Sequence, residues 1–229
     1  MPEESDDPSP VALEQRGVSA DRRMFSPSAA RNSAPILKVI KRVFPTTGLV
    51  LEIGCGTGEH AVRFAETMPN LIWQPSDPDT NSRASTASWI KFVGLKNVRA
   101  PLDIDVCLTS WGVEETAPFD AIVSINMVHI APWAASLGLF AGAGRLLRAG
   151  GLLVLYGPFM RGGVHTAPSN AEFDVSLKAR NPSWGVRDLA DLKRVGQASR
   201  LSFREMIDMP SNNAVIVFYK DNGQTTVVH

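Results

Sequence analysis

The fold of this chain is decided by the stretch Leu49-Val50-Leu51-Glu52-Ile53-Gly54-Cys55-Gly56-Thr57-Gly58. Its first half is a short apolar run that indicates a buried strand, and a helical pattern from Glu59 to Met68 follows the glycines. Glycines between a strand and a helix let the backbone turn sharply and approach a ligand closely. The unpaired N–H groups at the start of the helix favour an anionic or electron-rich group. The stretch therefore predicts a ligand-binding loop, and a tight turn that binds nothing is the alternative.

Strand and helix patterns alternate along the rest of the chain. Apolar runs separated by helices indicate a parallel sheet that is buried on both faces. Strands are expected at residues 49–53, 71–77, 98–104, 119–125, 152–156, 201–209 and 214–219. Helices are expected at residues 27–45, 59–68, 82–93, 133–147, 170–180 and 186–199. The last two strands flank the turn-rich tetrapeptide 210–213, which predicts a closing antiparallel hairpin.

The composition is that of one large globular domain. The chain has 229 residues, of which 44% are hydrophobic and 20% charged. Lys plus Arg and Asp plus Glu both number 23, so the chain as a whole has no electrostatic attraction for a phosphate backbone, and we expect no nucleic acid partner. The only cysteines are Cys55 and Cys107, which excludes a disulfide framework.

Segments outside the alternating pattern give the expected domain organisation. Residues 1–20 are acidic and contain three prolines, which predicts a disordered tail before a single domain at 21–229. The N-terminus lacks the basic and apolar segments of a signal peptide. The richest apolar run, residues 119–144, is interrupted by polar residues and cannot span a bilayer. We therefore expect a cytoplasmic protein with no membrane partner. The long connection at 158–185 is expected to form a substrate lid.

The residues around the glycine loop narrow the class of ligand. Dinucleotide-binding loops require a third glycine at the position of Glu59, and phosphate-binding loops require a Gly-Lys-Ser/Thr ending that is absent. Asp77 lies at the end of the second predicted strand, where a carboxylate can accept hydrogen bonds from both ribose hydroxyls of an adenosine. Asp103 and Asp105, at the end of the third, are suited to accept from an adenine amino group. A solvated carboxylate is the alternative for each.

The motif from Glu52 to Gly58, together with the acid at Asp77, resembles the class I S-adenosylmethionine-dependent methyltransferases over residues 48–219. The resemblance implies a Rossmann-like α/β fold: a seven-stranded, mostly parallel sheet with a C-terminal antiparallel hairpin and helices on both faces. More narrowly, the chain is similar to a small uncharacterised family that includes methyltransferase-like protein 26. Segments 25–32, 73–77, 125–129, 140–145, 156–158, 165–170 and 184–188 carry this closer match. The sequence departs from that family at residues 54–56, where Gly-Cys-Gly replaces an expected Ala-Ser-Gly.

The resemblance implies a cofactor, S-adenosylmethionine, and a set of site residues. The candidate cofactor-binding residues are Arg31, Glu52, Gly54, Cys55, Gly56, Gly58, Asp77, Asp105, Val106 and Asn126. The candidate catalytic residues are Asn126, His129 and His165, and the candidate acceptor-binding residues are Phe25, Met127, His129, Tyr156 and His165. A helix-capping asparagine, a core histidine and a surface arginine are the alternatives for Asn126, His129 and Arg31. No carboxylate–histidine cluster has ligand spacing, so we expect no metal.

The expected activity is transfer of a methyl group from S-adenosylmethionine to a small-molecule acceptor. Enzymes that methylate amino groups commonly carry Asn/Asp-Pro-Pro-Tyr after the fourth strand, whereas this chain has Asn126-Met127-Val128-His129. The acceptor atom remains open among oxygen, sulfur and nitrogen, and the protein is expected to be a monomer or a homodimer. A nicotinamide-dependent oxidoreductase and a non-enzymatic cofactor-binding module are the alternatives.

Overall fold

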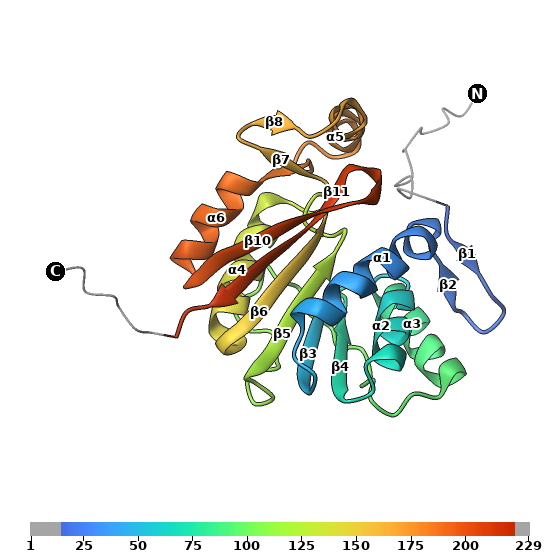
Figure 1. The fold of residues 1–229 in the computed structure, drawn as a ribbon. Helices are drawn as coiled ribbons and strands as arrows, with labels where there is room; N and C mark the ends of the chain where they lie inside the picture. The colour runs from blue at the N-terminus through green and yellow to red at the C-terminus, as the bar shows by residue number, and fades with distance from the viewer. Residues whose placement is uncertain (1–14, 223–229) are drawn as a thin grey trace, which may run out of the picture.

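The computed structural model describes residues 15–222 and has helices packed on both faces of a central sheet (Figure 1). The main strands are β3 Gly48–Ile53, β4 Leu71–Ser76, β5 Phe119–Ile125, β6 Leu147–Gly157, β10 Leu201–Met209 and β11 Asn213–Lys220. The helices are α1 Pro27–Val43, α2 Glu59–Thr67, α3 Thr80–Val93, α4 Trp133–Leu146, α5 Pro168–Arg180 and α6 Leu189–Ala198. Short strands complete the described chain: β1 Gly17–Val18, β2 Met24–Phe25, β7 Phe159–Arg161, β8 Val164–His165 and β9 Arg187–Asp188.

Within residues 15–222 the central sheet has six strands in the order β10-β11-β6-β5-β3-β4. Strands β4, β3, β5 and β6 run parallel, and β11 pairs antiparallel with both β6 and β10. The predicted α/β class and the closing hairpin are confirmed. Strand order reverses between β3 and β5, and ligands bind at such a switch point in open α/β sheets.

The expected seventh strand, residues 98–104, is a correction to the sequence prediction. This segment lies beside β4 but forms only two isolated bridges, Trp73 with Val98 and Ser76 with Leu102. The two bridges are three residues apart on β4 and four apart on the other segment, so a bulge separates them. Pro75 and Pro101 also lack an N–H to donate, and the ladder is interrupted there.

Each face of the sheet carries its own hydrophobic core. Val50 of β3 packs with α1 and α2 residues such as Ile40 and Phe64. Its neighbour Leu51 points to the opposite face and packs with α4 and α6, where Phe140 is fully buried. Alternation of this kind follows from the two-residue period of a strand. The sheet is therefore covered on both sides, and its ligand-accessible surface is confined to the strand ends.

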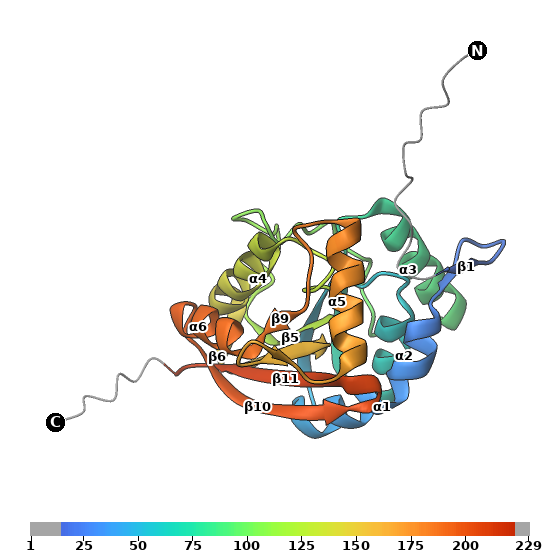
Figure 2. The same ribbon diagram turned by 90° about the horizontal axis from the view of Figure 1, so that it is seen from above.

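The long connection after β6 lies over the carboxyl ends of the parallel strands. Strands β8, β7 and β9 form a small separate sheet, and α5 follows β8. Seen from above, α5 crosses the middle of the molecule, with α4 on one side and α1, α2 and α3 on the other (Figure 2). The helix expected to begin at residue 186 begins at Leu189, because residues 187–188 pair with β7 and the Asp188 carboxylate caps the helix.

The N-terminal segment is only partly described. Residues 1–14 of the expected tail lie outside the described residues. Within residues 15–20, Gly17 and Val18 form β1, which pairs antiparallel with β2, so this part of the expected tail belongs to a hairpin. In the described part of the chain, the helices are too short or too polar to cross a membrane.

Candidate functional site

The glycine loop follows β3 and turns through left-handed backbone conformations. Gly54 and Gly56 have φ values of 71° and 55°, which a residue with a side chain adopts only with strain. A Cβ on Gly56 would meet no described atom within 4 Å, so the main chain is bare on that side. A ligand can therefore lie directly against the peptide at Gly56.

Asp77, which follows the neighbouring strand β4, is hydrogen-bonded to this loop. Its Oδ2 accepts a hydrogen bond from the N–H of Gly56 at 2.9 Å, and its Oδ1 accepts one from the N–H of Asp79 at 2.9 Å. Burial raises the pKa of Asp77, and the two N–H donors oppose that rise. Carboxylate oxygens keep further lone pairs when each accepts one bond, so Asp77 can also accept from ligand hydroxyls.

A cavity of about 990 Å³ opens from the glycine loop and runs along the strand ends. Its volume is at the upper end for a small-molecule site. The structure brings most of the predicted site residues to this cavity: Arg31, Gly54, Cys55, Gly56, Asp77, Asp105, Val106, Asn126, Met127, His129 and Tyr156. They come from α1, the ends of β3, β4, β5 and β6, and the segment after residue 104. The cavity therefore spans the switch point of the sheet.

Three predicted cofactor-side residues do not line the cavity. Glu52 is buried inside the sheet, where its Oε2 accepts a hydrogen bond from the Trp73 indole at 2.7 Å. Burial raises the pKa of Glu52 to about 8. Gly58 begins α2, and a Cβ there would lie 2.5 Å from the Thr86 hydroxyl, so this glycine permits helix packing. Asp103 is exposed and pairs with Arg83 without lining the cavity, whereas the nearby Asp105 lines it.

Phe25 and His165 are the predicted acceptor-side residues that lie elsewhere. The Phe25 ring packs edge-on against Trp89, with centroids 5.2 Å apart. The pairing of β7 with β8 turns His165 toward a second cavity of about 530 Å³. Its Nε2 lies 3.5 Å from Oδ2 of Asp174, which is on α5. The structure therefore separates His165 from the other candidate catalytic residues.

Asn126 and His129 lie where β5 ends. Asn126 has a φ of 56°, and its N–H donates to the carbonyl of Tyr156 at 2.8 Å. His129 is 4% exposed, and its Nδ1 has no hydrogen-bond partner among the described residues. Burial first, and then the positive charge of Arg187, lowers the pKa of His129 to about 3. His129 is therefore a neutral imidazole at physiological pH, and its ring lines the cavity.

Close packing fixes the position of the His129 ring. A Cβ on Gly157 would lie 3.1 Å from Nδ1 of His129, so only glycine fits there without displacing the ring. The ring of Phe173, on α5, lies edge-on to the imidazole with centroids 5.7 Å apart. The predicted lid segment therefore contributes directly to this end of the cavity.

Several polar residues of the same end were not predicted from the sequence. The amide Oδ1 of Asn32 lies 2.8 Å from Nε2 of His60, and hydrogen bonds from Asn32 and Asn213 partly offset the rise in pKa that burial imposes on Tyr156. Other cavity-lining residues that were not predicted include Asn170, Phe173, Trp184 and Asn212. The signal for Asn212 and Asn213 was present: a turn that begins an antiparallel partner of β6 must lie at the carboxyl end of β6.

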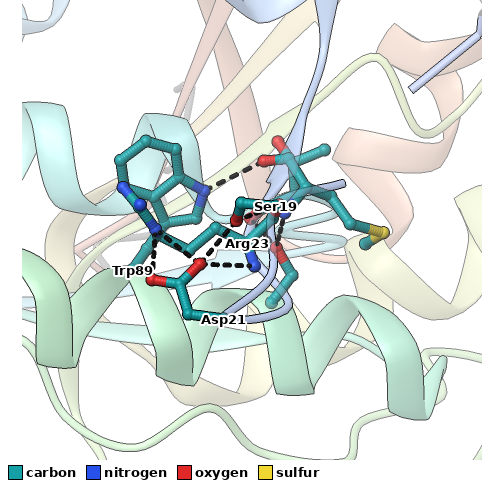
Figure 3. A network of polar contacts seen from close by, with 7 residues as sticks. Ser19, Asp21, Arg23 and Trp89 are labelled. Carbon is teal, nitrogen blue, oxygen red and sulfur yellow. Dashed lines mark hydrogen bonds and ion pairs between the residues drawn. The ribbon is translucent and has the colours of Figure 1, made fainter. Parts of the chain in front are cut away.

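The N-terminal hairpin attaches the segment before α1 to the glycine loop. The N–H of Met24 donates to the Ser85 hydroxyl at 2.8 Å, and that hydroxyl donates to the carbonyl of Thr57 at 2.7 Å. The indole of Trp89 donates to the Met24 carbonyl at 3.0 Å. Figure 3 shows the associated cluster of Ser19, Asp21, Arg23 and Trp89.

Arg23 holds the tip of this hairpin. Its guanidinium pairs with Asp21 at 2.8 Å (Figure 3). Its Cζ lies 3.5 Å from the ring centroid of Phe92. Cation–π contacts of this kind contribute about 0.5–1 kcal/mol at exposed sites. The hairpin therefore fixes the entry to α1, from which Asn32 reaches the cavity.

A family described as "Protein of unknown function (DUF938)" matches residues 23–220. The chain belongs to this family. The match includes the glycine loop, the turn that carries His129 and the closing hairpin. The family description names no activity.

A curated relative and several solved structures give further similarities. Over 83 residues the chain is 32% identical to a tRNA (guanine-N(7)-)-methyltransferase of Rhodopseudomonas palustris (strain BisA53), a match that covers 36% of the DUF938 chain and 31% of the relative. The chain thus spans about a third of that curated relative.

Among solved structures, an O-methyltransferase family protein from Burkholderia thailandensis has a TM-score of 0.72 and 15% identity, covering 86% of this chain and 58% of that one. CalO1, a methyltransferase in calicheamicin biosynthesis in its SAH-bound form, has a TM-score of 0.66 and 18% identity. The match covers 82% of this chain and 54% of CalO1. A third similar structure is an O-methyltransferase family 2 protein from Planctomyces limnophilus DSM 3776 in complex with apigenin. It has a TM-score of 0.68 and 16% identity, and the match covers 84% of this chain and 60% of that one. The DUF938 chain shares the fold of these methyltransferases and spans just over half of their length.

Proposed function

We propose that this DUF938 protein is an S-adenosylmethionine-dependent methyltransferase that acts on a small-molecule acceptor, and that it belongs with methyltransferase-like protein 26. The observation that carries the proposal is the single cavity that joins the glycine loop to His129, with Asn126 between them. One end offers bare main chain and a ribose-binding carboxylate. The other offers aromatic, amide and imidazole groups. A transfer reaction needs two such subsites that meet.

The loop end fits an adenosyl group. Gly56 leaves open space where a side chain would project, and Asp77 presents carboxylate oxygens at the adjoining strand end. Asp105, Val106, Asn126 and Arg31 line the same cavity. We assign Asp105 and Val106 to the adenine, and Asn126 and Arg31 to the methionine end. We assign Asp77 to the ribose hydroxyls and Arg31 to the amino-acid carboxylate, which a guanidinium can bind with two hydrogen bonds.

The chemistry required of the protein is modest. S-adenosylmethionine would supply a methyl group on a positively charged sulfur, which retains the bond's electron pair when the methyl leaves. The protein must hold the acceptor atom in line with that methyl and exclude water, and positioning of this kind is worth up to about 7–11 kcal/mol. Phe173 and Trp184, from the connection that was predicted to be a lid, line the cavity. Their apolar rings favour a flat acceptor.

His129 is the proposed proton acceptor. A neutral imidazole that lines the cavity can accept a hydrogen bond from the O–H, S–H or N–H of the acceptor molecule through its unprotonated ring nitrogen. The acceptor heteroatom becomes strongly acidic as it gains the methyl group. The proton can therefore pass to His129 even though the pKa of this histidine is low, and general base assistance contributes about 100- to 10,000-fold.

The glycine loop disfavours the alternative function, a nicotinamide-dependent oxidoreductase. The Glu59 side chain occupies the region of the missing third glycine, and its Oε2 accepts hydrogen bonds from the N–H of Ser26 at 2.7 Å and from the Thr57 hydroxyl at 2.9 Å. A pyrophosphate near the helix start would meet this carboxylate, and like charges in a partly buried site repel.

Calorimetry and a turnover assay test the proposal together. We expect S-adenosylhomocysteine to bind the purified protein and raise its melting temperature, and NAD to do neither. Mass spectrometry of reactions with S-adenosylmethionine should then detect methyl transfer to small hydroxyl, thiol or amine compounds and none to bulk tRNA. Binding of NAD in place of S-adenosylhomocysteine would overturn the cofactor, and methylation of tRNA alone would overturn the acceptor class.

A further inference from the structure

Arg187 joins the connection after β6 to the turn that carries His129. The side chain of Arg187 begins in β9, and its Nε donates to the carbonyl oxygen of Val128 at 2.9 Å. Its Nη2 donates to the carbonyl oxygens of Ala131 and Ser183. Two of these three carbonyls flank His129 in the sequence. One guanidinium therefore spans the turn on which the imidazole is mounted.

The main chain next to Arg187 makes the same connection. The N–H of Gly185 donates to the carbonyl of His129 at 3.0 Å, and the N–H of Val186 donates to Oδ1 of Asp174 at 2.7 Å. Asp174 lies on α5, the helix that contributes Phe173 to the cavity. The turn, the segment 185–187 and α5 thus form one hydrogen-bonded unit.

The guanidinium is held by carbonyls and not by an ion pair. Among residues 15–222, no carboxylate lies within 4.0 Å of Arg187. The charged group that faces it from α5 is Asp174, which is itself bound by Lys178 at 2.6 Å. The side chain also lies over the Trp133 ring, with Cζ 5.6 Å from the centroid. The positive charge of Arg187 is therefore only partly offset where it faces His129.

We propose that Arg187 is the positioning residue for His129: its hydrogen bonds to the flanking carbonyls fix the turn that holds the imidazole at the cavity. Its positive charge also disfavours a protonated imidazole. The catalytic consequence of this role rests on the proposed methyltransferase function, but the structural role does not. Arginine suits the task because its planar group carries several donors in a fixed geometry, whereas the ammonium of lysine is a single point.

Nuclear magnetic resonance of the histidine side chains tests the structural part without any acceptor. The chain has only four histidines, so the His129 signals can be assigned with a His129→Asn variant. In the full-length protein we expect the His129 imidazole to remain neutral from pH 5 to 8, because its pKa is about 3. In Arg187→Gln the pKa of His129 should rise, because the nearby positive charge is lost, and a titration extended down to about pH 3 measures this rise against the wild type.

A lysine at position 187 separates the effect of the positive charge from the effect of the hydrogen bonds to the carbonyls. In Arg187→Lys the charge remains, so the pKa of His129 should stay low, while the loss of the bonds to two flanking carbonyls should broaden the His129 signals. Turnover should fall about 10- to 100-fold in both variants, the usual effect of a small misplacement at a reacting centre. Binding of S-adenosylhomocysteine should be unchanged, because Arg187 does not touch that end of the cavity. Millimolar guanidinium should restore part of the turnover of Arg187→Ala.

The control is Arg194→Gln, which removes an exposed arginine on α6 that pairs with Asp191. It should change neither the His129 signals nor turnover. The proposal is overturned if Arg187→Gln leaves the His129 titration as in the wild type, or if turnover and S-adenosylhomocysteine binding fall together with the unfolding midpoint. If the wild type binds no S-adenosylhomocysteine but Arg187→Gln still shifts the His129 titration, the proposed function fails and the positioning role stands.

Discussion

The two ends of the cavity are built in different ways. The loop end is formed by consecutive residues of β3, its glycine loop and the tip of β4, and its main contacts are backbone N–H groups and Asp77. The His129 end is assembled from the turn after β5, the end of β6, α5, and the turn between β10 and β11. A site built from main-chain groups of consecutive residues can therefore be recognised in one short stretch of sequence. A site built from side chains that are far apart in the sequence cannot.

The largest expected effect concerns the two histidines that the sequence could not distinguish. Replacing His129 by Asn should lower turnover about 100-fold or more, because the proton acceptor in the cavity is lost. Replacing His165 by Asn should leave turnover nearly unchanged, because His165 lines a different cavity. Initial rates with saturating S-adenosylmethionine measure both. A large loss in the His165 variant alone would reverse the assignment of the two cavities.

The second prediction concerns protein stability and distinguishes two glycines of the same loop, Gly58 and Gly56. Gly58→Ala should destabilise the fold by about 2–4 kcal/mol, because the new methyl collides with Thr86 and the residue has a φ of 86°. Gly56→Ala should cost only about 1–2 kcal/mol, since its Cβ enters open space, yet it should weaken ligand binding there. Urea unfolding and calorimetry with S-adenosylhomocysteine measure the two quantities. Equal losses of stability in the two variants would contradict the distinction.

A third prediction compares two carboxylates that lie at the ends of neighbouring predicted strands, Asp77 and Asp103. Asp77→Asn should weaken S-adenosylhomocysteine binding by about 1.5–3 kcal/mol, the usual range for hydrogen bonds to a charged group. Asp103→Asn should bind as the wild type does, because Asp103 is exposed and pairs with Arg83 outside the cavity. Titration calorimetry at constant salt gives both affinities. Equal affinities for the two variants would remove Asp77 from the site.

A fourth prediction concerns Glu52, which lies beneath the loop end. Burial raises its pKa to about 8, above the ordinary value of 4.5 that applies in the unfolded chain. The buried carboxyl therefore stabilises the fold fully below about pH 4.5, and this contribution is lost as the pH rises toward 8. Glu52→Gln should keep the hydrogen bond from Trp73 and show a flatter dependence of stability on pH. Unfolding free energies at pH 5 and pH 8 test this, and parallel curves for the two proteins would refute it.

Local patterns were sufficient for most of the fold and for the loop end of the site. The apolar run before Gly54, the glycines and the acid at Asp77 each act through neighbouring residues, and the structure has β3, the loop and β4 where they were expected. Residues 98–104 were misread as a strand because their apolar pattern is strand-like, while the interruptions at Pro75 and Pro101 depend on how two segments pair.

The His129 end depends mainly on pairings between segments that are far apart in the sequence. Asn213 reaches Tyr156 because β11 runs antiparallel to β6, and Arg187 reaches His129 because β9 pairs with β7. His165 was expected in the site because it belongs to the lid, but the register of β8 on β7 places it in the second cavity.

A crystal structure of the protein with S-adenosylhomocysteine tests the central claim most directly. We expect the adenosine to lie against Gly56 with its ribose hydroxyls on Asp77, and the sulfur to lie beside Asn126 on the side that faces His129. A ligand bound in the cavity of His165, or one whose ribose makes no contact with Asp77, would contradict it.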